Sequence, residues 1–168
     1  METSPEQIEL FDEAVRDHGA LVARIVSSYE ARAALAEELA QETFTALWRA
    51  LPAWRGEASM RTFLARIAHN VCVSHVRREV RRTDTEIDDQ TPSAADSPET
   101  VAGRNLERTR LLEAVSALPL AQRQVVTLHL EGFTDREVGE TLGISEGNVG
   151  VRLTRARTRL RALMGVAS

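Results

Sequence analysis

The segment at residues 83–101, TDTEIDDQTPSAADSPETV, constrains the fold of this chain more than any other feature. It holds two prolines, no aromatic residue and few apolar side chains, so burial cannot offset the conformational entropy lost on ordering it. A flexible acidic linker is therefore predicted over residues 83–103. It divides the 168-residue chain into two predicted domains, at 5–82 and 104–165, each large enough for only a modest core.

Both predicted domains carry apolar residues at helical spacing, and neither shows the sustained alternation that is typical of β-strands. The predicted fold class is therefore all-α. Gly19 leaves open whether the first region is one bent helix or two consecutive helices. The first predicted helix begins at Pro5, after a capping box of Ser4 and Gln7. Further helices are predicted at 33–51, ended by Pro52, at 60–82, capped by Ser59, and at 104–117 and 121–131.

The stretch TDREVGETLGISEGNVGVRLTRARTRL, which starts at Thr134, predicts a helix-turn-helix. Thr134 and Glu137 form a capping box for a short helix, Gly143 lies in a tight turn, and Ser145 caps a longer basic helix. A helix-turn-helix places its last helix in the major groove of DNA. The sequence therefore predicts DNA binding by the second domain.

Charge is distributed in segments that the formal net charge of −4 hides. Residues 51–82 carry seven Arg against two acidic residues, and residues 145–168 carry five Arg against one Glu. Residues 83–100, between them, carry six acidic residues and no Arg. Two basic patches on either side of an acidic linker are typical of a protein with two contacts to nucleic acid.

The last helix divides into faces when its residues are placed at helical intervals of about 100°. Asn148, Arg152, Arg155 and Arg159 share one face, beside a predicted buried face, while Arg157 and Arg161 lie on the opposite flank. Asn and Arg can read base edges in the major groove. We expect Asn148, Val151, Arg152, Thr154 and Arg155 to enter the groove, Arg157, Arg159 and Arg161 to contact the backbone or lie on the surface, and Val149, Leu153, Ala156, Leu160, Leu163 and Met164 to be buried.

Three blocks carry a family resemblance: AEELAQETFTALWRAL, WRGEASMRTFLARIAHNVCVSHVRRE and ALPLAQRQVVTLHLEGFTDREVGETLGISEGNVGVRLTRARTRLRAL. In this order the chain resembles a sigma factor of the extracytoplasmic function (ECF) group, the small two-domain initiation factors of bacterial RNA polymerase. The resemblance implies that the first block docks on the clamp helices of the largest polymerase subunit. It further implies that the second block melts and reads the minus-ten promoter element, that the third reads the minus-thirty-five element, and that an anti-sigma factor controls the protein.

The resemblance assigns site residues in the first domain. Holding single-stranded bases requires a loop pocket, an aromatic platform and nearby cations, although core packing is the alternative role for Trp54. The expected minus-ten residues are Trp54, Arg55, Gly56, Ser59, Arg61, Arg66, Asn70, Arg77 and Arg78, with Arg81 and Arg82 along the phosphates. The expected polymerase-binding residues are Glu38, Leu39, Gln41, Glu42, Thr45, Trp48 and Arg49.

His69, Cys72 and His75 raise the question of a metal site. They spread over about 120° of a helix, and no fourth ligand lies nearby in the sequence, so we expect no metal. Cys72 is expected at the edge of the core, and the two histidines are expected partly exposed or near DNA. No motif of an enzyme or of a cofactor site is present, so the chain is predicted to be a binding protein rather than an enzyme.

No apolar stretch is long enough to span a bilayer, and a single cysteine fits a reducing compartment, so a cytoplasmic location without membrane insertion is expected. Two other interpretations remain open. The chain could be a stand-alone helix-turn-helix regulator that binds operator DNA without polymerase, or a helical adaptor whose basic patches are solvated faces.

Overall fold

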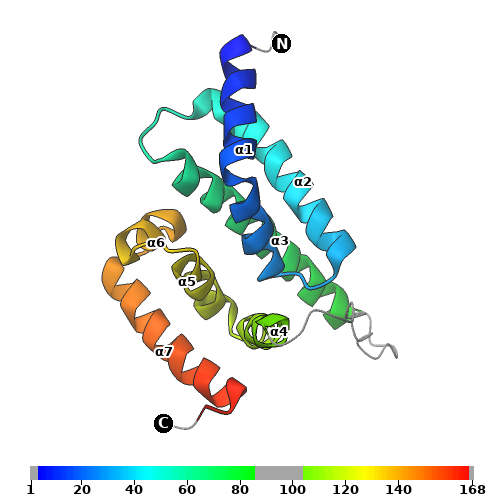
Figure 1. Cartoon of the computed structure of the whole chain (residues 1–168), viewed down its shortest axis with the longest axis vertical. Coiled ribbons are helices and arrows are strands. Elements are labelled where there is room, and N and C mark those ends of the chain that lie inside the picture. Colours follow the sequence, from blue (N-terminus) through cyan, green and yellow to red (C-terminus); the bar gives the residue numbers. More distant parts are fainter. Residues whose placement is uncertain (1–3, 86–103, 167–168) are drawn as a thin grey trace.

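The computed structural model describes residues 4–85 and 104–166, and in these ranges it has seven α-helices, one short 3-10 helix and no strand (Figure 1). The predicted all-α class is therefore confirmed. Most of the predicted linker lies outside the described residues. Its first residues, 83–85, belong instead to the end of a helix, so the third helix is one turn longer than predicted.

The first half of the chain folds as three long helices that pack together. They are α1 (Pro5–Ser27), α2 (Ala33–Ala50) and α3 (Met60–Thr85), and the 3-10 helix η1 (Leu51–Ala53) follows α2. The first helix runs through Gly19 without a break, which settles the alternative left open by the sequence. The core between the three helices is made by fully or nearly fully buried side chains, among them Leu21, Val22, Ile25, Leu47, Leu64 and Ala68.

The helix caps of this half agree only in part with the prediction. Ser59 Oγ accepts the backbone N–H of Thr62 at 3.1 Å and caps α3 as expected. Ser4 lies at the N-cap of α1, but its side chain makes no capping hydrogen bond. The side chain of Gln7 donates instead to the carbonyl of Trp48 at 3.0 Å, so the predicted capping box is replaced by a link between α1 and α2.

The second half contains α4 (Arg104–Ser116), α5 (Leu120–Leu130), α6 (Asp135–Leu142) and α7 (Glu146–Met164). The capping box of Thr134 and Glu137 is present at the start of α6, and Ser145 Oγ accepts the backbone N–H of Asn148 at the start of α7. The predicted helix-turn-helix is thus confirmed. Its core is made by Val115, Val125, Leu128, Val138, Val149 and Leu153.

The turn between α6 and α7 is tight. Gly143 ends α6 with a φ of 69°, in the left-handed region that glycine adopts without strain. Gly139 lies one turn earlier, and a Cβ placed on it would meet the backbone oxygen of Ile144 at 2.7 Å. Glycine at this position therefore allows the backbone of the turn to approach α6 closely.

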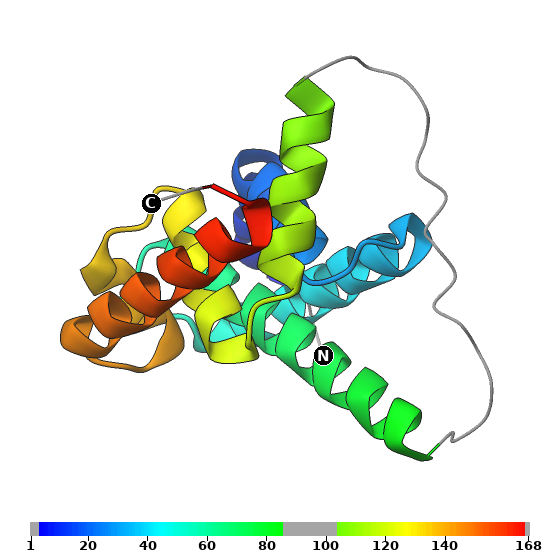
Figure 2. The same cartoon turned by 90° about the horizontal axis from the view of Figure 1, so that it is seen from below.

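The two halves lie side by side. In both views α6 lies beside the first turns of α3, and contacts between these two helices join the halves (Figures 1 and 2). Within the described ranges, no helix combines the length and the apolar character needed to cross a membrane.

We predict that Gly139→Ala lowers the free energy of unfolding of the second half by about 1–3 kcal/mol, because the new methyl group would push the carbonyl of Ile144 out of the turn. Urea unfolding followed by circular dichroism measures this. Both tryptophans lie in the first half of the chain. Their fluorescence therefore reports on unfolding of the first half and not of the half that carries Gly139.

Gly147→Ala is the matched control. Gly147 is exposed in the first turn of α7, and its Cβ would meet no atom within 4 Å among the described residues. Removing a helical glycine at such a position stabilises by about 0.5–1 kcal/mol. A Gly139→Ala variant as stable as Gly147→Ala would contradict the close approach in the turn.

Candidate nucleic-acid interface

The exposed face of α7 is basic, and its buried face holds it in the domain. Val149, Leu153 and Ala156 are at most 4% exposed, as predicted. Arg152 lies beside this buried face, is half-buried, and donates from Nε to Asn148 Oδ1 at 3.0 Å. This hydrogen bond between neighbouring turns orients two groups that can read base edges. The other predicted minus-thirty-five residues, Val151, Thr154, Arg155 and Arg159, are exposed beside this pair.

The last turn of α7 departs from the prediction. Leu163 is 49% exposed and Met164 is 42% exposed, so the expectation that both are buried is wrong. They line an open groove together with Leu111 and Ala114 of α4. The helical repeat correctly put them on the same face as Leu153, but the core does not extend this far along the helix.

The loop before α3 holds Trp54 against the start of that helix. Trp54 Nε1 donates to the carbonyl of Ala58 at 3.2 Å, and its ring centroid lies 6.3 Å from that of Phe63. The indole is half-buried. Its exposure lies between that of a core residue and that of a fully exposed platform for a DNA base. Gly56 turns the loop with a φ of 74°, while Arg55 and Ser59 are exposed. A shallow hollow beside the indole is lined by Trp54, Arg55, Phe63, Arg66 and Glu140.

Two of the predicted minus-ten residues contact the second half of the chain. Arg61 donates to the backbone carbonyl of Glu131, and its guanidinium carbon lies 3.8 Å from the centroid of the Phe133 ring. Arg66 donates to the backbone carbonyl of Glu140 at 2.7 Å. No pattern in the sequence indicated these contacts, because the acceptors are backbone atoms more than 60 residues away.

The remaining predicted minus-ten residues lie further along α3. Asn70, Arg77 and Arg78 are all exposed. Arg78 forms an ion pair with Glu42 of α2, with the nitrogen and oxygen 3.8 Å apart. The predicted minus-ten face therefore touches the predicted polymerase-binding face.

The polar face of α2 forms largely as predicted. Glu38, Gln41, Glu42, Thr45 and Arg49 are exposed along one side of the helix. Leu39 is 4% exposed and belongs to the core, so it packs α2 against the domain and offers little surface of its own. Trp48 is half-buried and packs edge to face on Phe11, with ring centroids 5.2 Å apart.

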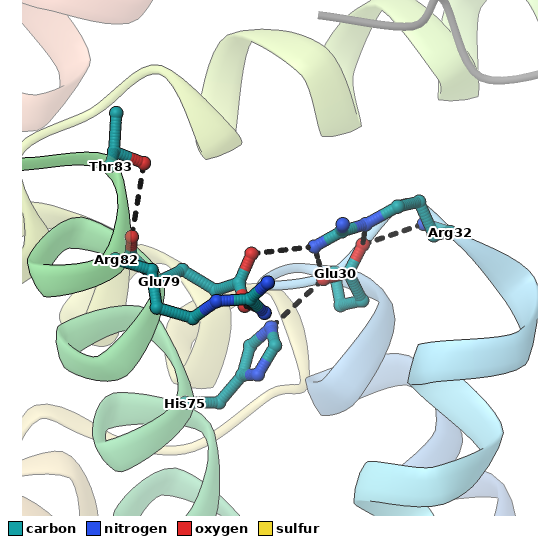
Figure 3. Close-up of polar contacts among 6 residues, drawn as sticks. All are labelled: Glu30, Arg32, His75, Glu79, Arg82 and Thr83. Atoms are coloured by element: carbon teal, nitrogen blue, oxygen red, sulfur yellow. Dashed lines mark hydrogen bonds and ion pairs between the residues drawn. The ribbon is translucent and has the colours of Figure 1, made fainter. Parts of the chain in front are cut away.

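A buried carboxylate that the sequence analysis missed joins the α1–α2 connection to α3 (Figure 3). Glu30 accepts hydrogen bonds from the backbone N–H, Nε and a terminal nitrogen of Arg32, and its side chain is only 6% exposed. His75 Nε2 lies 2.9 Å from the same carboxylate, and Arg32 also donates to Glu79 at 3.1 Å. This cluster fixes α3 just before its basic stretch at residues 77–82.

The pKa of Glu30 reflects two opposing effects. Burial by itself raises the pKa, but the hydrogen bonds from Arg32 and His75 outweigh burial and lower the pKa to about 2. The carboxylate is therefore ionised at neutral pH. Its contacts also explain why His75 is buried, at 8% exposure, although partial exposure was expected.

His69 and Cys72 are likewise fully inside the domain. His69 Nδ1 lies 2.7 Å from the hydroxyl of Tyr29, and burial lowers the pKa of His69 to about 3. Cys72 is 0% exposed, and burial, with a smaller contribution from the charge of Glu42, raises its pKa to about 12. The expected places of both residues, a partly exposed histidine and a cysteine at the edge of the core, are therefore wrong.

The structure shows no metal-binding arrangement around these residues. In the described part of the chain, no three His, Cys, Asp or Glu side chains come together as ligands. His69 and His75 face different partners, the hydroxyl of Tyr29 and the carboxylate of Glu30.

We predict that Glu30→Gln lowers the free energy of unfolding by about 1–3 kcal/mol near neutral pH, because it removes a paired, buried charge. The pKa of Glu30 is depressed from 4.5 to about 2 in the folded chain. The ionised carboxylate therefore stabilises the fold above about pH 4.5, and this contribution is lost as the pH falls toward 2. Urea unfolding followed by tryptophan fluorescence should show the difference from the unmutated protein shrinking over that pH range.

Glu37→Gln serves as the control, since Glu37 is an exposed glutamate on α2. It should leave the unfolding free energy nearly unchanged at every pH. A Glu30→Gln deficit that is independent of pH would show that the lost stability comes from packing and not from the ionised carboxylate.

Comparisons with known proteins agree with this geometry. A family model described as sigma-70 region 2 matches residues 14–82, and one described as sigma-70 region 4 matches residues 108–160. RNA polymerase sigma factor YlaC of Bacillus subtilis is 32% identical over 133 residues, covering 77% of each chain. The ECF RNA polymerase sigma factor SigM of Mycobacterium tuberculosis is 27% identical, covering 92% of this chain and 77% of that protein.

Two solved structures of sigma factors are similar to this chain over most of its length. CnrH, solved in complex with the cytosolic domain of CnrY, is 26% identical with a TM-score of 0.69, covering 94% of this chain and 89% of that one. The sigma factor RpoE of Bartonella quintana, solved with the anti-sigma factor NepR, has a TM-score of 0.78 over 94% of this chain and 98% of that chain; at 22% identity it is similar in fold. The two matched regions, their order and the identity to YlaC lead to one conclusion: this chain belongs to the ECF group of the sigma-70 family of RNA polymerase sigma factors.

Proposed function

We propose that this sigma factor binds core RNA polymerase through α2 and directs initiation by contacting promoter DNA at two places. The observation that carries the proposal is the hydrogen-bonded Asn148–Arg152 pair on a correctly capped helix-turn-helix, in a chain whose other half matches sigma-70 region 2. In this proposal the domains are the predicted ones, 5–82 and 104–165, and the protein acts by binding rather than as an enzyme.

The minus-thirty-five element is read by α7. Asn148 and Arg152 lie in its first half, where a recognition helix meets base edges, and their hydrogen bond holds both side chains in a defined orientation. Arg155 enters the groove one turn later, and Arg159 contacts the phosphate backbone. The buried residues Val149 and Leu153 fix the rotation of the helix, and hence which side faces DNA.

The melted minus-ten element is held by the loop before α3 and by α3 itself. The hollow beside Trp54 has an aromatic wall and the cations Arg55 and Arg66 at its edge, as an unstacked base requires, and Glu57 and Glu140 also line it. Arg77 and Arg78 lie further along the helix, where they neutralise phosphates.

Polymerase binds the exposed polar face of α2, which consists of Glu38, Gln41, Glu42, Thr45 and Arg49, with the half-buried Trp48 at its border. A face of carboxylates, an amide and a hydroxyl fits a partner surface with basic and polar groups. The clamp helices of the largest subunit are that partner by family resemblance. Leu39 acts indirectly, by packing this helix onto the core.

Control by an anti-sigma factor is part of the same proposal. CnrH was solved with the cytosolic domain of CnrY, and the RpoE structure holds the anti-sigma factor NepR. A partner that covers the α2 face and the two basic surfaces would prevent polymerase and promoter binding together. The proposed location of the protein is the cytoplasm, where polymerase and promoter DNA are present.

Reconstitution tests the proposal as a whole. The purified chain is added to core RNA polymerase with a library of random double-stranded DNA, and transcribed templates are selected and sequenced. We expect transcripts from templates that share two separated sequence elements. A chain that does not bind core polymerase would refute the proposal, and tight operator binding without polymerase would favour a stand-alone regulator.

We predict that Arg152→Ala and Arg155→Ala each reduce discrimination between the selected minus-thirty-five element and a scrambled one by about 10- to 100-fold, because each removes a contact to base edges. Arg157→Ala, on the opposite flank of α7, should weaken binding to both DNAs alike. Competition transcription assays with the two templates measure this. An equal loss of discrimination in all three variants would refute the assignment of faces.

A further inference from the structure

The last turns of α3 carry basic residues but project from the core of the first domain (Figure 2). His75 is the last buried residue of this helix, and Val76 is half-buried. Of residues 77–85, all are exposed except Glu79, which is half-buried. Most helical stability in proteins comes from the packing of an apolar face, and these turns have none. Polar contacts must therefore hold the end of α3 in place.

A chain of hydrogen bonds ties Glu79 to the interior of the domain (Figure 3). Glu79 Oε2 accepts a hydrogen bond from a terminal nitrogen of Arg32 at 3.1 Å. The same nitrogen donates to the carboxylate of Glu30 at 2.8 Å, and the Glu30 side chain is 6% exposed. Arg32 and Glu79 are 47 positions apart, so their contact fixes the end of α3 on the connection between α1 and α2.

The other polar contacts of this helix end are local or longer. Arg82 donates to Glu79 at 3.4 Å, from within the same helix. Arg78 pairs with Glu42 at 3.8 Å, but each of these two side chains is about half exposed and belongs to a surface proposed to bind another partner. In the part of the chain that the structure describes, the pair of Arg32 with Glu79 is therefore the shorter of the two side-chain links from this helix end to another element.

The place of Glu79 on the helix determines which way the neighbouring arginines point. Residues of an α-helix are about 100° apart, so Arg77 and Arg81 each lie about 160° round α3 from Glu79. Holding Glu79 on Arg32 therefore turns both arginines to the opposite side. Among the described residues, no carboxylate lines the open groove that Arg77 and Arg81 share with Arg78. Cations grouped in this way suit the phosphates of a single strand.

We propose that Glu79 is a positioning residue for DNA, which holds the end of α3 on Arg32 so that Arg77 and Arg81 meet phosphates of the melted minus-ten strand. This inference rests on the proposed function for the role of these arginines in binding DNA. It has a consequence of defined sign. By its charge alone a carboxylate near phosphates weakens DNA binding, whereas a carboxylate that orders two arginines strengthens it.

Removal of the carboxylate tests this sign. The full chain is titrated with a fluorescent pool of single-stranded 15-mers, randomised at every position, at several salt concentrations. We expect Glu79→Ala to bind the pool about 3- to 10-fold more weakly than the unmutated protein, with a shallower salt dependence, because fewer phosphates are neutralised. Alanine is the best helix former, so a loss of binding does not come from a lower helix propensity.

Asp84→Ala is the matched control. Asp84 is an exposed carboxylate on the same helix, about 140° round from Glu79 and thus on the side of the arginines. Its removal takes away the same charge without releasing the contact to Arg32. Asp84→Ala should therefore bind the pool as tightly as the unmutated protein or slightly more tightly. A loss of affinity equal to that of Glu79→Ala would overturn the proposal.

A double-mutant cycle tests the partner of Glu79. Arg32→Ala should also weaken binding of the pool. In the Arg32→Ala background, the further change Glu79→Ala should not weaken binding again, because the contact between the two side chains is already lost. Additive losses in the double variant would overturn the role of Arg32.

Hydrogen exchange followed by mass spectrometry shows whether the helix end itself is affected. Residues 80–85 should exchange faster in Glu79→Ala than in the unmutated protein, while the core of α1 should exchange as before. Faster exchange throughout α1 would show general loss of stability, and a loss of DNA binding accompanied by it would overturn the positioning role.

The remaining outcomes separate this inference from the proposed function. A Glu79→Ala variant that binds the pool as tightly as the unmutated protein, or more tightly, would overturn the proposal. So would weaker binding without faster exchange at the end of α3. An unmutated chain that binds neither the pool nor core polymerase would instead refute the proposed function, and with it the role of Glu79 in DNA binding.

Discussion

The packing of α3 against α1 and α2 is the interaction on which the rest of the structure depends. Its first half is buried through Leu64, Ala68 and Cys72, while its second half extends beyond the core and carries the basic residues 77–82. Polar contacts fix the helix at two places, at its start by the Ser59 cap and at His75 by the carboxylate of Glu30. One helix therefore holds the core together and also carries Arg61, Arg66, Asn70, Arg77 and Arg78 of the proposed minus-ten contacts.

Local physical rules predict most of the fold. Thr134, Glu137 and Ser145 predicted helix starts that the structure confirms, because a cap depends on only three or four consecutive residues. The rotation of α7 was equally predictable, since Val149 and Leu153 recur at the helical period. Leu163 shows the limit of this reasoning: periodicity assigns a residue to a face, but only tertiary structure decides where along that face the core ends.

The contacts that the sequence did not predict are those between residues far apart in the chain. Glu30 with His75, and Arg61 with the carbonyl of Glu131, join residues 45 and 70 positions apart. A backbone carbonyl has no residue type, so no sequence pattern marks it as an acceptor. His75 carries a side-chain signal, but a histidine beside arginines suggests DNA contact as readily as a buried partner. Such contacts become visible only when the helices are placed in space.

Arginine in this structure binds two kinds of negative group, and promoter DNA is a third in the proposed function. Arg32 is satisfied by the carboxylate of Glu30, Arg61 by the C-terminus of α5, and Arg155 is exposed for a phosphate or base. The first acceptor is ionised and almost buried, so its contact with Arg32 helps to hold the fold together. The second is a neutral carbonyl that carries only a partial charge, so it is the weaker acceptor of the two. The strength of the acceptor thus separates arginines that hold the fold together from those that remain available for DNA.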